Sequence, residues 1–238
     1  PVIDINNNPL NPVINYRSFG ESRTRVTQKS IAYMKGLQAA GIMAVAKHFP
    51  GHGDTQTDSH YSLPIIEHDR ARLDSIELYP FRKLIQADID GIMMAHINVP
   101  ALDAIPKRAA TLSKKIVTDL LKTEMGFKGL VFTDAMNMKG VTSGHDLGEP
   151  ELMAYLAGND IIEFSLNIGA SITQIEDALK AGSLTTDQIE IKCRRILHQK
   201  YKLGLHKKSF HKSENLILDI NNQTARDLNN TLAKASLT

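Results

Sequence analysis

Short apolar runs alternate with longer segments of helical periodicity along most of the chain. The runs have the length and composition of buried strands and lie at residues 2–5, 42–46, 90–95, 130–133 and 160–164. Each is followed, directly or after a polar loop, by a segment with helical spacing. A strand followed by a helix, five times over, indicates parallel strands joined by right-handed crossovers. We therefore predict an α/β fold with a parallel sheet.

The helical segments are bounded by recognisable start and stop residues. They span residues 21–40, 69–87, 113–125, 149–157, 172–181 and 186–203. Gly41 and Gly126 end the first and the third, Ser113 is a good N-cap for the third, and Pro80 interrupts the second. These signals agree with the strand pattern.

Five βα units are too few for the common (β/α)8 barrel of roughly 250 residues. We therefore predict a partial TIM-type (β/α)8 barrel with about five units present, in which the first three would precede Pro1. Residues 1–205 would form the carboxy-terminal part of the barrel. Residues 206–238 would form a linker and a helical appendage that could lead to a further domain. An open barrel edge is expected to favour self-association.

The composition is that of an ordinary globular domain. The 238 residues are 42% hydrophobic and 23% charged, and 28 basic and 26 acidic residues leave a net charge of +2. This balance predicts no nucleic-acid partner. The basic tract His206, Lys207, Lys208, His211 and Lys212 is interpreted as a solvated connector.

Two other sequence features concern the membrane and the cysteine chemistry of the protein. No apolar stretch approaches the roughly 18 residues that span a bilayer, so we predict no membrane span. Cys193 is the single cysteine, permits no internal disulfide and is expected to be a small buried residue. Nothing here selects between the bacterial cytoplasm and periplasm.

Candidate chemistry gathers directly after the second predicted strand. Residues 47–64 contain three histidines, two aspartates and a lysine among prolines and glycines. Such a long segment without periodicity favours a functional loop. Asp134 directly follows the strand 130–133, although a turn or N-cap aspartate is the alternative. Because barrels build active sites at the carboxyl ends of strands, we predict that both regions contribute to one site.

The histidines of this loop allow more than one interpretation. Asp58 and His60 could form a pair in which the carboxylate orients the ring, or an Asx turn beside an exposed histidine. His48 and His52 are spaced like metal ligands, but the intervening Pro50 and Gly51 break the helix that would align them. Lys47 and His48 could hydrogen-bond a polar substrate. His96, after the third predicted strand, suits either a core histidine or a ligand contact.

Two motifs carry a resemblance to a known family. Lys47-His48-Phe49-Pro50-Gly51-His52-Gly53-Asp54-Thr55 with Asp58-Ser59-His60, and Thr133-Asp134-Ala135-Met136-Asn137-Met138-Lys139-Gly140, resemble the β-N-acetylglucosaminidases of glycoside hydrolase family 3. Shorter matches at residues 1–4, 17–19, 157–160 and 194–197 extend the resemblance over residues 1–205. Tyr16 departs from the pattern, since members commonly have an aspartate there.

The resemblance implies a mechanism. Asp134 would attack the anomeric carbon, and His60, oriented by Asp58, would act as acid and base in retaining hydrolysis. A neutral histidine could do this without placing a second anion beside Asp134. Lys47, His48 and Arg17 would bind sugar hydroxyls. No metal or organic cofactor has a role in this scheme.

The same resemblance implies a substrate. It would be a glycan with a terminal β-linked N-acetylglucosamine, either a muropeptide or a chitooligosaccharide, which would suit a bacterial enzyme of peptidoglycan recycling. Phosphate could replace water as the acceptor. Two alternatives stay open: a metal-dependent barrel hydrolase with His48, His52 and His60 as ligands, and an inactive or incomplete barrel fragment.

Overall fold

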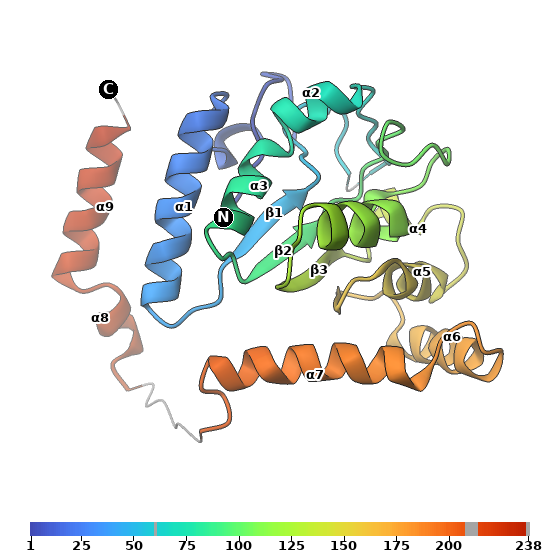
Figure 1. The fold of residues 1–238 in the computed structure, drawn as a ribbon. Helices are drawn as coiled ribbons and strands as arrows, with labels where there is room; N and C mark the ends of the chain where they lie inside the picture. The colour runs from blue at the N-terminus through green and yellow to red at the C-terminus, as the bar shows by residue number, and fades with distance from the viewer. Residues whose placement is uncertain (60, 208–213, 237–238) are drawn as a thin grey trace. The chain divides into compact units, whose positions relative to one another are not determined.

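The computed structural model describes residues 1–59, 61–207 and 214–236. The chain divides into two compact units, Pro1–Leu203 and Gly204–Thr238. The strands β1 (Val45–Phe49), β2 (Gly91–Met94), β3 (Leu130–Ala135) and β4 (Ile161–Glu163) belong to the first unit. They form one parallel sheet in the order β1-β2-β3-β4 (Figure 1). The predicted α/β fold is confirmed, and the sheet is open rather than closed into a barrel.

The first predicted strand is not a regular strand. Only Val2 bridges β1, in parallel with Lys47, through the amide of Ile3 and the carbonyl of Pro1. The pairing stops because the side chain of Asp4, not a backbone carbonyl, accepts the amide hydrogen of His48. The segment still lies beside β1, as predicted.

The second predicted strand is displaced along the chain. Its ladder begins at Val45, which pairs with Gly91, so β1 runs three residues beyond the predicted end at residue 46. The polar residues Lys47 and His48 therefore belong to the strand and not to the following loop. They are accommodated because hydrogen bonds from Val2–Asp4 on one side and β2 on the other satisfy the backbone.

The helices largely follow the predicted periodicity. The first is α1 (Arg23–Ala39), where Ser22 accepts a hydrogen bond from the Arg25 amide. The predicted helix 69–87 is two helices, α2 (Arg70–Ser75) and α3 (Tyr79–Gln86). Pro80 lies in the first turn of α3, where no helical hydrogen bond is lost.

Other helices differ from their predictions mainly at their ends. The remaining ones of the first unit are η1 (Asn15–Arg17), η2 (Ala110–Leu112), η3 (Lys115–Glu124), α4 (Lys139–Thr142), α5 (Glu149–Ala157), α6 (Ile168–Lys180) and α7 (Thr186–Lys202). The π-helical η3 begins after the predicted Ser113, whose hydroxyl nevertheless accepts the Ile116 amide hydrogen. The start of α6 is earlier than predicted because Asn167 caps it.

The core lies between the sheet and the helices that cover it. Phe49 of β1 and Phe81 of α3 meet edge to face with ring centroids 5.0 Å apart. Asp160, before β4, binds Lys122 of η3 and Arg195 of α7 at 3.1–3.3 Å. The partly buried ion pair between Arg195 and Asp160 holds α7 to the sheet. Cys193 of α7 is exposed, so the expectation of a buried cysteine was wrong. It lies two residues from Arg195, and residues at this spacing are on different sides of a helix.

The second unit is described by itself. It contains α8 (Leu216–Ile220) and α9 (Gln223–Ala235), whose N-cap Asn222 accepts a hydrogen bond from Ala225. Lys208, His211 and Lys212 of the basic tract lie outside the described residues. Among the residues that are described, no helix combines the length and apolar character needed to cross a membrane.

Candidate active site

The carboxyl ends of the strands bring polar side chains to one edge of the sheet. Lys47 and His48 come from β1, His96 follows β2, Asp134 lies near the end of β3, and Glu163 ends β4. Because all four strands are parallel, these residues share the edge where α/β barrels carry active sites. Asp134 and the Lys47–His48 pair therefore lie on the same edge of the sheet.

Asp4 holds the ring of His48. Its carboxylate lies 2.8 Å from His48 Nδ1 and accepts the backbone amide hydrogens of His48 and, at 2.7 Å, His52. Asp4 is 1% exposed, and burial alone would raise its pKa, but His48 and His52 hold the pKa below the usual value. An ionised carboxylate only accepts, so Nδ1 of His48 carries the proton and Nε2 faces the site.

Asp134 lies opposite that nitrogen. Its Oδ1 accepts the amide hydrogen of Ala135 at 2.8 Å, and its Oδ2 is 3.9 Å from His48 Nε2. Burial would raise the pKa of Asp134, but His48, the Ala135 amide and His96 hold it below the usual value. Asp134 is therefore an ionised carboxylate at neutral pH, with one oxygen beyond hydrogen-bonding distance of the imidazole.

Glu163 supplies a second carboxyl group that the sequence analysis missed. It belongs to the neighbouring strand β4, and its amide donates to the Thr133 hydroxyl of β3. Burial is the largest cause that raises the pKa of Glu163, and the charge of Asp134 is the second. The charge of Lys47 opposes the rise. The two carboxyl groups thus have pKa values pushed in opposite directions. The signal in the sequence was an acidic residue within the last predicted strand.

His96 supports the site from within the core. Its Nε2 donates to the carbonyl of Ala135 at 3.1 Å, and its Nδ1 lies 2.8 Å from the Thr111 hydroxyl. Burial lowers its pKa to about 4, so the ring is neutral at neutral pH. Of the two interpretations of His96, the geometry favours a core histidine that positions the residue after Asp134.

The loop after β1, residues 50–64, is braced by its own side chains. His52 Nδ1 lies 2.8 Å from the Thr55 hydroxyl, and Nε2 lies 3.1 Å from the Ser59 hydroxyl. Burial lowers the pKa of His52 to about 4. The carbonyl of Ser59 accepts the amide hydrogen of Gly140 in α4. The two sequence motifs therefore meet at Ser59 and Gly140.

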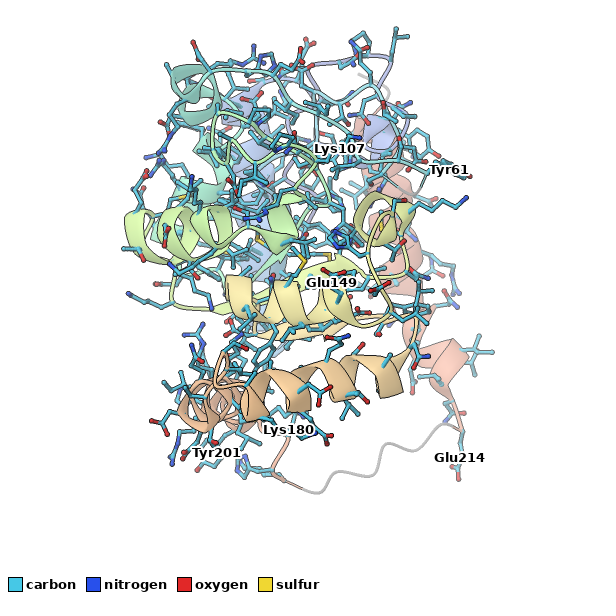
Figure 2. The ribbon with its side chains drawn as sticks, turned by 90° about the vertical axis from the view of Figure 1, so that its right-hand side faces the viewer. Tyr61, Lys107, Glu149, Lys180, Tyr201 and Glu214 are labelled. Carbon is cyan, nitrogen blue, oxygen red and sulfur yellow. The ribbon has the colours of Figure 1, made fainter. Side chains whose placement is uncertain are left out.

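The remaining predicted site residues are placed differently. Asp58 is half-buried, and its carbonyl accepts the amide hydrogens of Tyr61 and Ser62. His60, the predicted acid and base, lies outside the described residues. Tyr61 is 75% exposed and points outward from the molecule (Figure 2). Arg17 is exposed in η1 and donates to the Val13 carbonyl, while its neighbour Ser18 bonds the Asp4 carbonyl at 2.6 Å.

For His48 and His52, the two histidines of this motif that the structure describes, the geometry does not support the metal-ligand interpretation. Both ring nitrogens of His52 contact hydroxyl groups, and Nδ1 of His48 binds Asp4. Among the described residues, the side chains that are grouped like metal ligands are instead Asp54, His68 and Glu77.

An open parallel α/β sheet with carboxylates and histidines at its carboxyl edge is the arrangement of α/β barrel proteins, which carry their active sites at that edge. The model of the glycosyl hydrolase family 3 N-terminal domain matches residues 1–199. Beta-hexosaminidase A of Pseudoalteromonas piscicida is 39% identical over 222 residues, which cover 85% of this chain and 37% of that protein. The chain belongs to glycoside hydrolase family 3.

Solved structures agree with this assignment. A family 3 beta-N-acetylglucosaminidase from Paenibacillus sp. str. FPU-7 superposes with a TM-score of 0.85 at 37% identity, covering 89% of this chain and 41% of that one. The beta-glucoside phosphorylase BglX superposes with a TM-score of 0.89 at 27% identity, covering 95% and 42%. The chain spans 37% and 45% of the length of the first two curated relatives.

Proposed function

We propose that the protein to which this chain belongs is a retaining glycoside hydrolase that removes terminal β-linked N-acetylglucosamine. The observation that carries the proposal is the ionised Asp134 at the end of β3, facing a His48 ring that Asp4 holds in place. The names of the relatives support the sugar specificity, since two of them are a beta-hexosaminidase and a beta-N-acetylglucosaminidase. Muropeptides or chitooligosaccharides are the proposed substrates.

In the proposed reaction, Asp134 Oδ2 attacks the anomeric carbon while the glycosidic bond breaks. His60 donates a proton to the departing oxygen, and a covalent glycosyl-enzyme forms. His60 then takes a proton from water, which attacks the anomeric carbon and releases Asp134. Asp58 would orient His60. The contact between Ser59 and Gly140 supports this assignment because it holds the loop around residue 60 against the segment that follows Asp134.

Sugar binding is proposed for three cationic or imidazole groups. Lys47 and His48 lie in the strand that ends at the site, and the positive charge of Lys47 helps to lower the pKa of Asp134, which supports a position of Lys47 near the sugar. Arg17 would reach the sugar from the loop that Ser18 fastens to Asp4. We further propose that residues 1–205 belong to the catalytic barrel and that residues 206–238 are a linker and appendage.

A slow-reacting 5-fluoro derivative of a β-N-acetylglucosaminide, which keeps the acetamido group on carbon 2, tests the nucleophile. Incubation with this chain, and with a longer protein that contains it, should attach one sugar to the peptide carrying Asp134, as measured by mass spectrometry. Asp134→Asn should abolish the labelling and the hydrolysis of a chromogenic substrate. Labelling of Glu163 or another carboxylate would show that the nucleophile is assigned wrongly.

The acid and base role of His60 needs a separate experiment. His60→Ala should lower turnover of substrates with poor leaving groups far more than of substrates with acidic leaving groups, which need little protonation. His198→Ala, which removes an exposed histidine of α7, is the matched control. Near-normal hydrolysis of a poor leaving group by His60→Ala would contradict the role.

Phosphate is a second candidate acceptor, favoured by the likeness to a beta-glucoside phosphorylase. A neutral histidine base would not repel the phosphate anion as a carboxylate base would. Added phosphate should then accelerate turnover and yield a sugar 1-phosphate, detectable by ³¹P NMR. Free sugar as the sole product at all phosphate concentrations would exclude this acceptor.

A further inference from the structure

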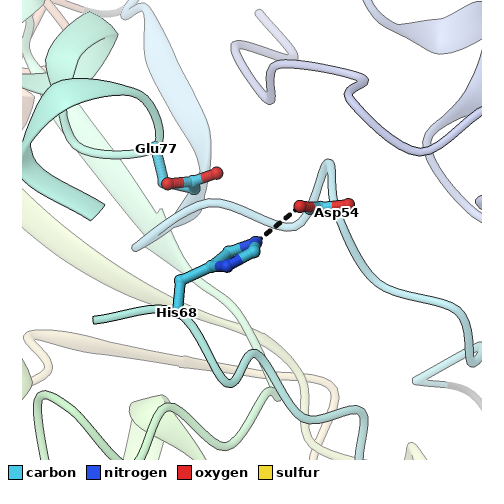
Figure 3. Close-up of side chains that lie close together, drawn as sticks. All are labelled: Asp54, His68 and Glu77. Atoms are coloured by element: carbon cyan, nitrogen blue, oxygen red, sulfur yellow. Dashed lines mark hydrogen bonds and ion pairs between the residues drawn. The ribbon is translucent and has the colours of Figure 1, made fainter. Parts of the chain in front are cut away.

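A compact group of three ligand-type side chains lies outside the set of residues described for the candidate active site. Asp54 comes from that loop, His68 precedes α2, and Glu77 lies between α2 and α3. One potential ligand atom from each lies within 4.8 Å of the other two. Figure 3 shows the Glu77 carboxylate beside the His68–Asp54 pair, whose Nε2 and Oδ2 are 2.6 Å apart. Movements of these side chains would bring the three atoms to the spacing of about 3.3 Å that ligands of one tetrahedral ion have.

Glu77 provides an independent sign of a missing partner. The residue is 3% exposed, and its Oε2 is buried without a hydrogen-bond partner among the described residues. Its Oε1 accepts from Arg72 at 3.2 Å and from Asn7 at 3.5 Å. A buried carboxylate oxygen with no donor is unusual, because desolvation is then uncompensated. A cation, unlike a further carboxylate or carbonyl, would satisfy it.

The charges on Asp54, Glu77 and their neighbour Arg72 are compatible with a bound cation. Arg72 also approaches Asp54 Oδ2 at 3.4 Å, so one guanidinium is shared by two carboxylates. Apart from His68, the side chains of Asp54, Glu77 and Arg72 carry a net charge of −1 when both carboxylates are ionised. Burial raises the pKa of Glu77, although its own backbone amide, Arg72 and His68 oppose the rise. One guanidinium thus balances only one of the two carboxylates.

We propose that Asp54, His68 and Glu77 form a binding site for a divalent cation of the zinc class, apart from the Asp134 site. One imidazole and two carboxylates are donors that suit Zn²⁺ better than Mg²⁺ or Ca²⁺, which prefer oxygen ligands alone. Zinc would replace the short His68–Asp54 hydrogen bond. The two atoms would separate to about 3.3 Å, as tetrahedral ligands at roughly 2.0–2.1 Å require.

The bound ion would join the 50–64 loop to the segment between α2 and α3. The loop already packs there, since a Cβ at Gly51 would lie 2.9 Å from Glu77 Cβ. The inference does not rest on the proposed glycosidase function, because the site consists of other residues and its test measures binding. Loss of glycosidase activity would leave it untouched.

Titration of the full chain with ZnCl₂ in a calorimeter tests the site. We expect saturable binding of one ion at this site and at least a tenfold loss of affinity in His68→Gln and in Asp54→Asn. Both residues are partly exposed, so these variants should fold, as circular dichroism can check. Glu67→Gln, which neutralises the exposed carboxylate next to His68, should bind Zn²⁺ like the unaltered chain.

A second measurement separates this site from the histidines near Asp134. X-ray absorption of the zinc-loaded chain should show one imidazole ligand, lost in His68→Gln and kept in His48→Gln. Equal zinc affinity in the unaltered chain, His68→Gln and Asp54→Asn would overturn the proposal, as would loss of binding only in His48→Gln. Absence of measurable binding to the unaltered chain would also overturn it and identify the group as an ion-pair network.

Discussion

Asp4 is the residue on which the geometry of the candidate active site depends most directly. It fixes the proton of His48 on Nδ1 and at the same time receives two backbone amide hydrogens at the end of β1. The ring of His48 thereby presents Nε2 towards Asp134. A carboxylate that orients a histidine in this way acts through that histidine and not on the substrate.

We expect Asp4→Asn to lower kcat/KM by roughly 10–100-fold, the range found when a partner that orients a functional histidine is lost. An amide can donate to Nδ1 as well as accept, so the proton of His48 would no longer be held there. Kinetics with a chromogenic β-N-acetylglucosaminide and histidine NMR spectra would measure both effects. Asp88→Asn, at an exposed turn, is the control, and an unchanged His48 tautomer in Asp4→Asn would contradict the prediction.

Two buried histidines predict a loss of stability in mild acid. The pKa values of His52 and His96 are lowered to about 4, whereas unfolded histidine titrates near 6.5. Between these values the unfolded chain binds more protons, so their contribution is complete above pH 6.5 and is lost as the pH falls towards 4. Each would contribute about 3 kcal/mol at most.

Urea unfolding at several pH values between 4 and 7 would measure this effect. The midpoint should fall steadily below pH 6.5, and His96→Gln should be less stable at pH 7 but show a smaller further fall. A variant of an exposed histidine, His198→Gln, should keep the full pH dependence. A midpoint that is constant over this interval would show that the two histidines do not titrate on unfolding.

At the level of elements, the contact of α4 with the 50–64 loop decides how the two sequence motifs are arranged. The amide of Gly140 donates to the Ser59 carbonyl, and a Cβ at residue 140 would lie 2.7 Å from that oxygen. Neither partner is a flexible side chain, so a larger residue must move backbone. Gly140 thus permits the close approach of the segment after Asp134 to the loop that carries Asp58.

Gly140→Ala should displace this loop and lower kcat/KM by at least tenfold, since small misplacements of reacting groups are costly. The loss of stability should be about 1–3 kcal/mol, typical of overpacking. Gly36→Ala is the control, because a Cβ there meets nothing within 4 Å inside α1. Activity and urea unfolding would be compared. Unchanged activity in Gly140→Ala would mean that the loop position is unimportant for the reaction.

At the scale of the whole molecule, β4 is the last strand of the sheet, and an apolar surface lies beside it. Phe164, Leu166, Ile168 and Ile172 are exposed there, with Phe164 at 75%. A cavity lined by Phe164, Ile168 and Ile172 together with Ile162 and Ile175 adjoins them. Clustered apolar side chains next to a sheet edge favour association, so we expect self-association to occur through this surface.

We expect this chain to associate in a concentration-dependent manner, measured by sedimentation velocity. The double substitution Phe164→Lys and Ile172→Lys should shift it towards the monomer, because charge opposes burial of this surface. Leu197→Lys, at an exposed position on α7, is the control for the added charge. A monomeric unaltered chain at high concentration would contradict the prediction.

The sequence by itself determined the order and type of most elements, the parallel sheet and the strand-end location of Asp134. Apolar periodicity, caps and glycine stops are local signals, so they need no knowledge of distant residues. Only the tertiary structure decided that Lys47 and His48 belong to β1 and that Asp4 orients His48. It also decided that Glu163 lies on the same edge of the sheet as Asp134. It also brought Asp54, His68 and Glu77 together. Those relations depend on the packing of segments far apart in the chain, which a local pattern does not encode.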